Sequence, residues 1–151
     1  MPLDRSTMLT LWSDSWSKGH GYVPWRDVLA HLTPANALWR PGPQRHSIWA
    51  HASHVAFWRE YLTASARGAT VPTQAEIATK NFETPGDAAH ASPELWRGAV
   101  ERVERSQRLI EDALRDPAVD PDVFGGLVAH DAYHLGQIML LRAMQGLKPL
   151  M

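Results

Sequence analysis

The sequence contains no cysteine, which excludes disulfide bridges, cysteine-ligated zinc, iron–sulfur clusters and an internal thiol nucleophile. It also lacks an excess of charge of one sign, because 15 Lys and Arg residues and 16 Asp and Glu residues give a formal net charge of -1. A nucleic-acid-binding surface needs clustered positive charge to displace counterions from phosphates. Nucleic-acid partners are therefore not expected.

Long apolar runs are missing as well. No window approaches the roughly 18 consecutive apolar residues of a transmembrane helix. Asp4, Arg5 and Asp14 interrupt the N-terminal apolar residues, unlike the core of a signal peptide. We therefore expect a cytoplasmic protein without a membrane partner. The 151 residues, 44% of them hydrophobic, suffice for the core of one domain over residues 1–151.

Helical periodicity dominates the sequence, and neither strand-like alternation nor an internal repeat is present. Residues that cap helices or end them predict four long helices, over about 3–18, 46–67, 92–115 and 120–145. Shorter helices are expected over 25–31 and 34–39, and 69–91 is expected to form a long connection. The pattern indicates an all-α fold, a four-helix bundle with longer connections between helices 1 and 2 and between helices 2 and 3.

Seven tryptophans accompany this pattern. Three lie at inward helical spacing and are expected in the core: Trp12, Trp16 and Trp58. Three others are candidates for an apolar entrance or a dimer face: Trp25, Trp39 and Trp49. On a helical wheel, Trp49, Ser53 and Glu60 fall on the outward side of the second long helix. The charged run Glu101–Arg105 is expected to be a solvated face of the third.

The eight histidines are the feature that needs an explanation. His130 and His134 lie one helical turn apart on the apolar stripe of the last helix, where both rings can reach a single ion. On the second long helix, His51 and His54 also face inward. Two facing helices would therefore place three or four imidazoles in one part of the bundle core.

A single histidine on an apolar face is usually a core residue whose ring nitrogens are hydrogen bonded. Several converging histidines are harder to satisfy, because each unpartnered buried polar group costs roughly 1–3 kcal/mol. The residues therefore favour a metal ion on three neutral imidazoles, with coordination positions open to water or substrate. A histidine core that binds no metal is the alternative.

Two segments resemble the DinB/YfiT-like superfamily of small four-helix bundles. One runs from Pro41 through Ser47-Ile48 to Arg59, and the other is His130-Asp131-Ala132-Tyr133-His134-Leu135-Gly136-Gln137-Ile138 with Leu141-Arg142 after it. The resemblance implies that His54, His130 and His134 hold a divalent ion. Gly19-His20-Gly21 resembles a Trp-His-Gly element of part of the family but lacks the Trp, so no role is assigned to His20.

Three further residues are candidates for contacts with the ion's ligands or with a substrate. His51 maps onto no ligand position of the family and is expected to support the ligands, with a core role or an extra ligand as alternatives. Gln137 would orient bound water or substrate, or else bond a neighbouring helix. Tyr133 would point its hydroxyl towards the rim of the site.

The resemblance implies a metal-dependent enzyme that acts on a small molecule. The ion, with zinc slightly favoured over nickel or iron, would activate water for hydrolysis or a low-molecular-weight thiol for S-transfer. Because the chain has no cysteine, such a thiol must come from outside. The alternative is a non-catalytic metal-binding or stress-associated bundle. A homodimer is expected by analogy alone.

Overall fold

The structure is a computed structural model that describes residues 4–150. Its regular elements in this range are all helical, which confirms the predicted all-α class. They are α1 (Arg5–Ser17), α2 (Trp25–Val28), α3 (Pro34–Leu38), α4 (Ile48–Ala66), α5 (Gln74–Lys80), α6 (Pro93–Arg115), the 3-10 helix η1 (Pro121–Phe124) and α7 (Gly125–Met144). The predicted start of the first helix at Leu3 lies outside the described residues.

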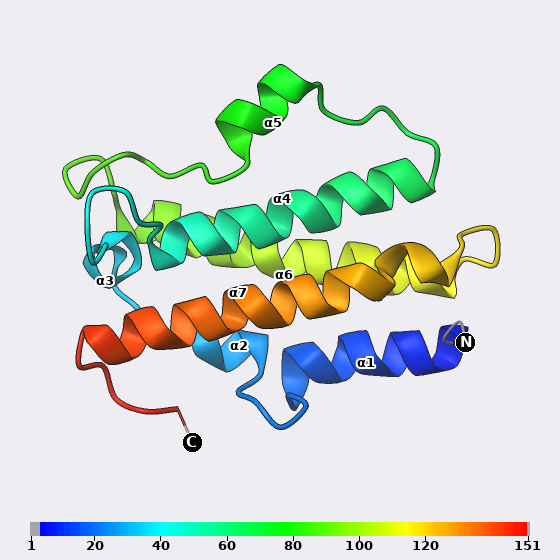
Figure 1. The fold of residues 1–151 in the computed structure, drawn as a ribbon, viewed down its shortest axis with the longest axis horizontal. Helices are drawn as coiled ribbons and strands as arrows, with labels where there is room; N and C mark the ends of the chain where they lie inside the picture. The colour runs from blue at the N-terminus through cyan, green and yellow to red at the C-terminus, as the bar shows by residue number, and fades with distance from the viewer. Residues whose placement is uncertain (1–3, 151) are drawn as a thin grey trace.

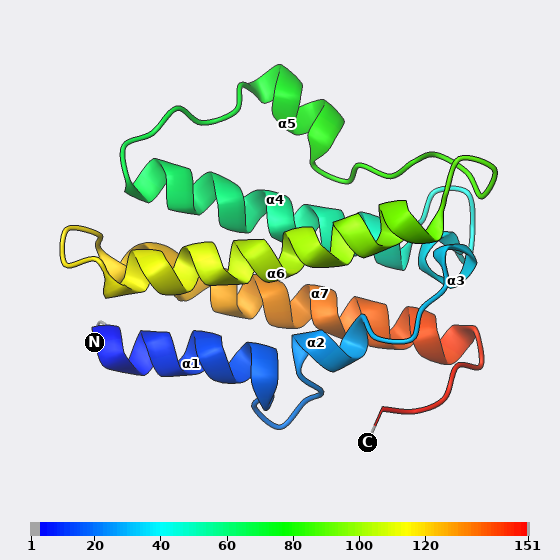
Figure 2. The same cartoon turned by 180° about the vertical axis from the view of Figure 1, so that it is seen from behind.

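Four long helices, α1, α4, α6 and α7, lie side by side and form the bundle (Figure 1). Helix α4 packs against both α6 and α7, and α1 packs against α6. Helices α2 and α3 fill the end of the bundle that α1 does not reach, as the view from behind also shows (Figure 2). Among residues 4–150, no helix has the length and apolar character that a bilayer crossing requires.

Side-chain caps mark most starts of the described helices. The side chains of Thr33, Ser47 and Ser92 accept hydrogen bonds from backbone N–H groups in the first turns of α3, α4 and α6. Two predicted bounds were wrong. The helix predicted over 25–31 ends at Val28, because His31 adopts a left-handed conformation (φ 57) that a helix cannot contain. The helix predicted from 120 begins as η1, and its α-helical part starts at Gly125.

The connection predicted over 69–91 contains a further helix, α5. It has no buried residue and lies outside the bundle, alongside α4 (Figures 1 and 2). A capping box starts it: the Thr73 hydroxyl accepts from the Glu76 backbone, and the Glu76 carboxylate accepts from the Thr73 N–H at 2.9 Å. Helix α5 is therefore held by its own capping and by the residues that follow it.

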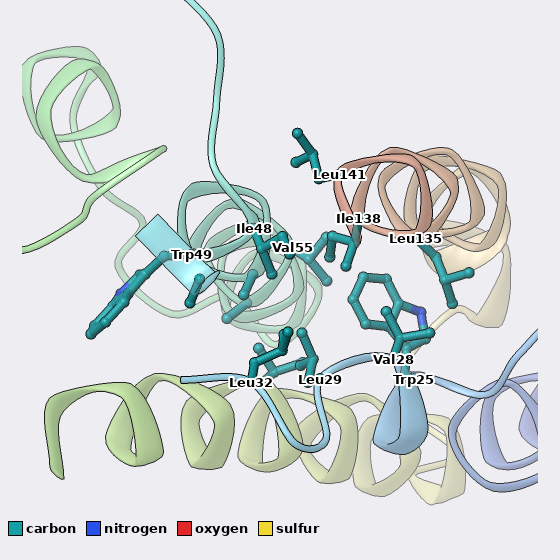
Figure 3. Packing of buried hydrophobic residues seen from close by; sticks show 14 of the residues in the cluster. Trp25, Val28, Leu29, Leu32, Ile48, Trp49, Val55, Leu135, Ile138 and Leu141 are labelled. Carbon is teal, nitrogen blue, oxygen red and sulfur yellow. The ribbon is translucent and has the colours of Figure 1, made fainter. Parts of the chain in front are cut away.

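The core consists of two clusters. One gathers residues of α2, α4, α6 and α7, and Figure 3 shows Trp25 and Val28 pointing towards Leu135 and Ile138. The other joins α1 to the ends of α6 and α7, with Trp12 and Phe124 fully buried.

Arg59 lies between the two clusters and has no exposed surface. Its guanidinium is 5.3 Å from the ring centroid of Trp12 in one cluster and 5.3 Å from that of Trp25 in the other. Its charge is balanced by Asp131, whose Oδ2 accepts from Arg59 Nε at 2.7 Å. A buried ion pair on α4 and α7 therefore connects the two halves of the core.

The expectation that Trp49 and Ser53 face outward was wrong. Both are buried, and the Trp49 ring packs against Trp96 of α6 with ring centroids 5.1 Å apart. Glu60 is half-buried and accepts two hydrogen bonds from Arg102 of α6. Helix α4 has no free face in its N-terminal half, because α6, α7 and α3 surround it.

The other tryptophans were expected either in the core or at an apolar entrance or dimer face. Trp12 is fully buried, and Trp16 and Trp58 are half-buried against the clusters, as predicted for core residues. Trp25 is also core, which excludes it from an entrance or a dimer face. Trp39 stays exposed at 36%.

Candidate metal centre

Helices α4 and α7 bring three histidines to one point in the bundle: His54, His130 and His134, here called the histidine triad. One ring nitrogen of each lies within 4.8 Å of those of the other two. His54 and His134 are buried, and His130 is half-buried. The spacing of one turn on α7 and the close packing of α4 on α7 produce this convergence. The three nitrogens are close enough to share one ion.

The remaining ring nitrogen of two triad members has an oxygen partner. His54 Nδ1 lies 2.7 Å from Asn81 Oδ1, and His130 Nδ1 lies 3.0 Å from Asp131 Oδ1. A carboxylate and an amide oxygen only accept hydrogen bonds, so both Nδ1 atoms carry the proton. Because Asp131 is itself held by Arg59, the His130 ring is oriented by a chain of contacts that reaches into the core.

These protonation states leave both Nε2 atoms with a lone pair in the neutral rings. The Nε2 atoms of His54 and His130 nevertheless lie only 2.9 Å apart. Two lone pairs at this distance repel each other unless a proton or a cation lies between or beside them. The residues therefore fit a divalent ion, since three imidazoles of this kind are ligands that zinc and related metals accept.

His51 supports the third member of the triad. Its Nδ1 lies 2.9 Å from Nδ1 of His134, so one of these nitrogens donates and the other accepts. If His134 binds an ion through Nε2, its Nδ1 carries the proton and donates to His51. This contact accords with the expectation that His51 supports the ligands, and its role remains a prediction.

Burial keeps these rings neutral in the absence of an ion. Burial, the largest cause, and the neighbouring imidazoles together lower the pKa of His51 and His54 to about 4 and that of His134 to about 3. Asn81 opposes the shift at His54, because its oxygen favours the protonated ring. Neutral imidazole is the form that binds a metal, so no proton has to be displaced from a charged ring near neutral pH.

The stability of the metal-free protein should therefore depend on pH. In the unfolded chain these three histidines have a pKa near 6.5, so between about pH 6.5 and pH 4 the unfolded state binds more protons than the folded state. The free energy of unfolding is expected to be fully retained above pH 6.5 and to fall as the pH drops through this window. Urea denaturation of chelator-treated protein at several pH values measures the slope. A slope that His134→Asn leaves unchanged would contradict the assignment.

The segment after α5 covers the triad. The Phe82 ring stacks on the His54 ring with centroids 4.0 Å apart, and on the His46 ring with centroids 3.8 Å apart. Asn81, the residue before it, holds His54 as described above. Neither residue was expected at the site. The capping box of Thr73 and Glu76 was the available signal for a helix in this connection.

Replacing Asn81 by Ala should weaken metal binding by roughly 10–100-fold, the usual effect of losing a hydrogen bond that orients a ligand histidine. The affinity for Zn²⁺, measured by competition with a chromophoric chelator, checks this. Lys80→Ala is the matched control, because Lys80 ends the same helix and its ammonium pairs with Glu76 at 3.3 Å on the surface. Equal affinities of the two variants would remove Asn81 from the site.

Two cavities adjoin the triad. The first, of about 480 Å³, is lined by His51, Gln137 and Tyr133 among others. The exposed Tyr133 has its ring 5.0 Å from that of His134, and the direction of its hydroxyl towards the rim remains a prediction. The second, of about 430 Å³, is lined by His54 and His130 together with apolar side chains. A ligand in either cavity would therefore reach residues of the site.

Four histidines lie outside the triad and its His51 support. The His20 ring contacts the Leu11 carbonyl oxygen of α1 at 2.9 Å, so its observed contact is structural. His46 precedes α4, as expected, and stacks on Phe82. His31 and His90 are exposed. The structure thus brings together His51 and the triad, and leaves His20, His31 and His90 apart from them.

The family model of the DinB superfamily matches residues 24–138 of the chain. The matched range contains His51 and the triad, and leaves α1 and His20 outside. No curated protein and no solved structure matches the chain. Because the family model covers well over half of the sequence, the chain belongs to the DinB superfamily.

Proposed function

We propose that this protein is a metal-dependent enzyme that acts on a small molecule, with a divalent ion held by His54, His130 and His134. The observation that carries the proposal is the 2.9 Å approach of two Nε2 atoms whose rings each direct Nδ1 to an oxygen acceptor. An ion at this point would satisfy the lone pairs that the chain itself leaves unpartnered. Zinc suits three imidazoles best, and nickel or iron would also accept them.

When bound, the ion would supply a Lewis acid that lowers the pKa of a water molecule or of an external thiol. The chain's own residues supply orientation. Asn81 and Asp131 fix the rings of His54 and His130, and His51 holds that of His134. Gln137 has no side-chain hydrogen bond to any residue of 4–150 and lines the larger cavity, so its amide is free to orient a ligand there.

A catalytic site fits these features better than a purely structural one. Structural zinc sites are closed by four protein ligands, whereas three ligands leave a position for water or substrate. The triad offers three, and cavities of about 480 and 430 Å³ reach His51, His54 and His130. We therefore favour hydrolysis or S-transfer over a role in stability alone. A thiol for S-transfer would be a cosubstrate, because the chain has no cysteine.

The test is a reaction screen on protein purified without a histidine tag, as isolated, after chelation and after reloading with Zn²⁺. One arm offers activated esters and amides in water, and the other offers an electrophilic acceptor with low-molecular-weight thiols. We expect turnover in one arm that chelation removes and Zn²⁺ restores. Metal that raises the melting temperature while both arms stay at the uncatalysed rate would instead identify a non-catalytic metal-binding bundle.

A further inference from the structure

The two cavities lie at successive positions along the contact between α4 and α7, with the triad between them. His51, Gln137 and Leu141 line the first, whereas Trp58 and Leu127 line the second. Along α4, Trp58 follows His51 by seven residues, which corresponds to about 10 Å of helix axis. A ligand that reaches from His51 to Trp58 would therefore be about 10 Å long.

The first cavity contains one positive charge, that of Arg45, and is here called the cationic cavity. The neutral rings of His46 and His51 also line it, and no Asp or Glu is among its lining residues. Arg45 forms no ion pair with any carboxylate of residues 4–150. Arg40 and Arg45 also line a smaller adjoining hollow, again without a carboxylate.

Exposed Arg67 also forms no ion pair with a carboxylate of residues 4–150, but it lines neither cavity. Most arginines of α6 are paired with a carboxylate three or four residues away. Because Arg45 lines this cavity without a carboxylate partner and no Asp or Glu lies in the lining, the cavity is complementary to an anion. A guanidinium binds a carboxylate or a phosphate through paired hydrogen bonds.

The second cavity is here called the apolar groove. Besides His54 and His130, its lining consists of apolar side chains and a glycine: Trp58, Leu62, Val123, Gly126 and Leu127. It contains no charged side chain. Val123 is 37% exposed at its edge, and Trp58 is half-buried within it. Such a lining favours a hydrocarbon chain or ring.

From these two surfaces we propose that the substrate is an amphiphilic anion, with its acidic group at Arg45 and its apolar part in the groove beside His54 and His130. This inference names the substrate class and rests on the proposed function for its relevance to catalysis. The reacting bond would then lie between the two ends, next to the triad.

The experiment compares two probes of equal length and different charge, octanoate and octanamide, by isothermal titration calorimetry on the full chain. We expect octanoate to bind more tightly than octanamide. Arg45→Ala should weaken octanoate binding by about tenfold and leave octanamide unchanged. Arg67→Ala, at an exposed arginine outside both cavities, is the matched control and should change neither.

The apolar groove has its own pair of variants. Val123→Gln should weaken both probes several-fold, whereas Leu109→Gln, at a residue of α6 that is 38% exposed and lines neither cavity, should change neither. Equal binding of the two probes, unchanged octanoate binding in Arg45→Ala, or no binding of octanoate at millimolar concentration would each overturn the proposal.

The metal content of the same samples separates this inference from the proposed function. Arg45-dependent octanoate binding by protein that holds no metal, before or after Zn²⁺ is added, would support the anion site while refuting the metal-dependent activity. Octanoate that binds only to metal-loaded protein, and equally well in Arg45→Ala, would place the carboxylate on the ion and overturn the anion site alone.

Discussion

His134→Ala should reduce the bound metal from about one ion per chain to a small fraction of that value. The variant leaves two imidazoles, and two neutral ligands hold a divalent ion far more weakly than three. It also removes the partner of His51, whose Nδ1 lies 2.9 Å from that of His134. Elemental analysis of protein purified without a histidine tag and dialysed against metal-free buffer measures the effect. His54→Ala and His130→Ala should behave in the same way.

Two further variants make the test specific. His51→Ala should weaken Zn²⁺ binding by roughly 10–100-fold and keep the site, because His51 supports a ligand and is not one itself. His90→Ala is the matched control, since His90 is exposed and contacts Asp87 at 2.7 Å away from the triad. Wild-type metal content far below one ion per chain, unchanged in His54→Ala and His134→Ala, would refute the ligand assignment.

Asp131→Ala should destabilise the fold by about 3–5 kcal/mol, the range expected when one partner of a buried ion pair is removed. Arg59 would keep its charge with no exposed surface, beside the Trp12 and Trp25 rings and with the Val103 carbonyl oxygen 3.4 Å from Nη1 as its remaining acceptor. Its Nη2 already lacks a hydrogen-bond partner among the described residues. Urea denaturation of the metal-free proteins gives the difference in the free energy of unfolding.

The comparison variant is Glu60→Ala. Glu60 also pairs with an arginine, Arg102, but in a half-exposed position where such pairs contribute about 1 kcal/mol or less. If Asp131→Ala does not fold, Asp131→Asn keeps one acceptor oxygen and should show a smaller loss. A loss in both Asp131 variants no greater than that in Glu60→Ala would mean that the buried pair does not hold the two core clusters together.

The long helices could be predicted because their ends and their apolar faces are both visible in the sequence. Ser92-Pro93 predicts the start of α6 to within one residue. Asp120-Pro121 predicts the start of the last helical segment, which begins as η1. Helix α5 could not be found through periodicity, because none of its residues is buried and no apolar stripe exists. Its capping box carried the only local signal.

The outward face assigned to α4 shows a second limit of prediction from the sequence. A helical wheel assumes one buried side, whereas α4 is buried nearly all round from Ile48 to Phe57. Trp49 was therefore assigned to a surface that α6 covers. The triad could be anticipated because its members follow helical spacing and the family pattern. Asn81 could not, since it lies in a different segment and reaches His54 only through tertiary structure.

Helix α5 has a kinetic consequence. A segment with no buried side chain is not protected by the global stability of the bundle, so its amide hydrogens exchange with solvent through local unfolding that leaves α4 and α7 intact. Directly after α5, Asn81 and Phe82 contact the bundle at the site through His54 and His46. These few contacts therefore determine where local unfolding of α5 stops on the side of the site.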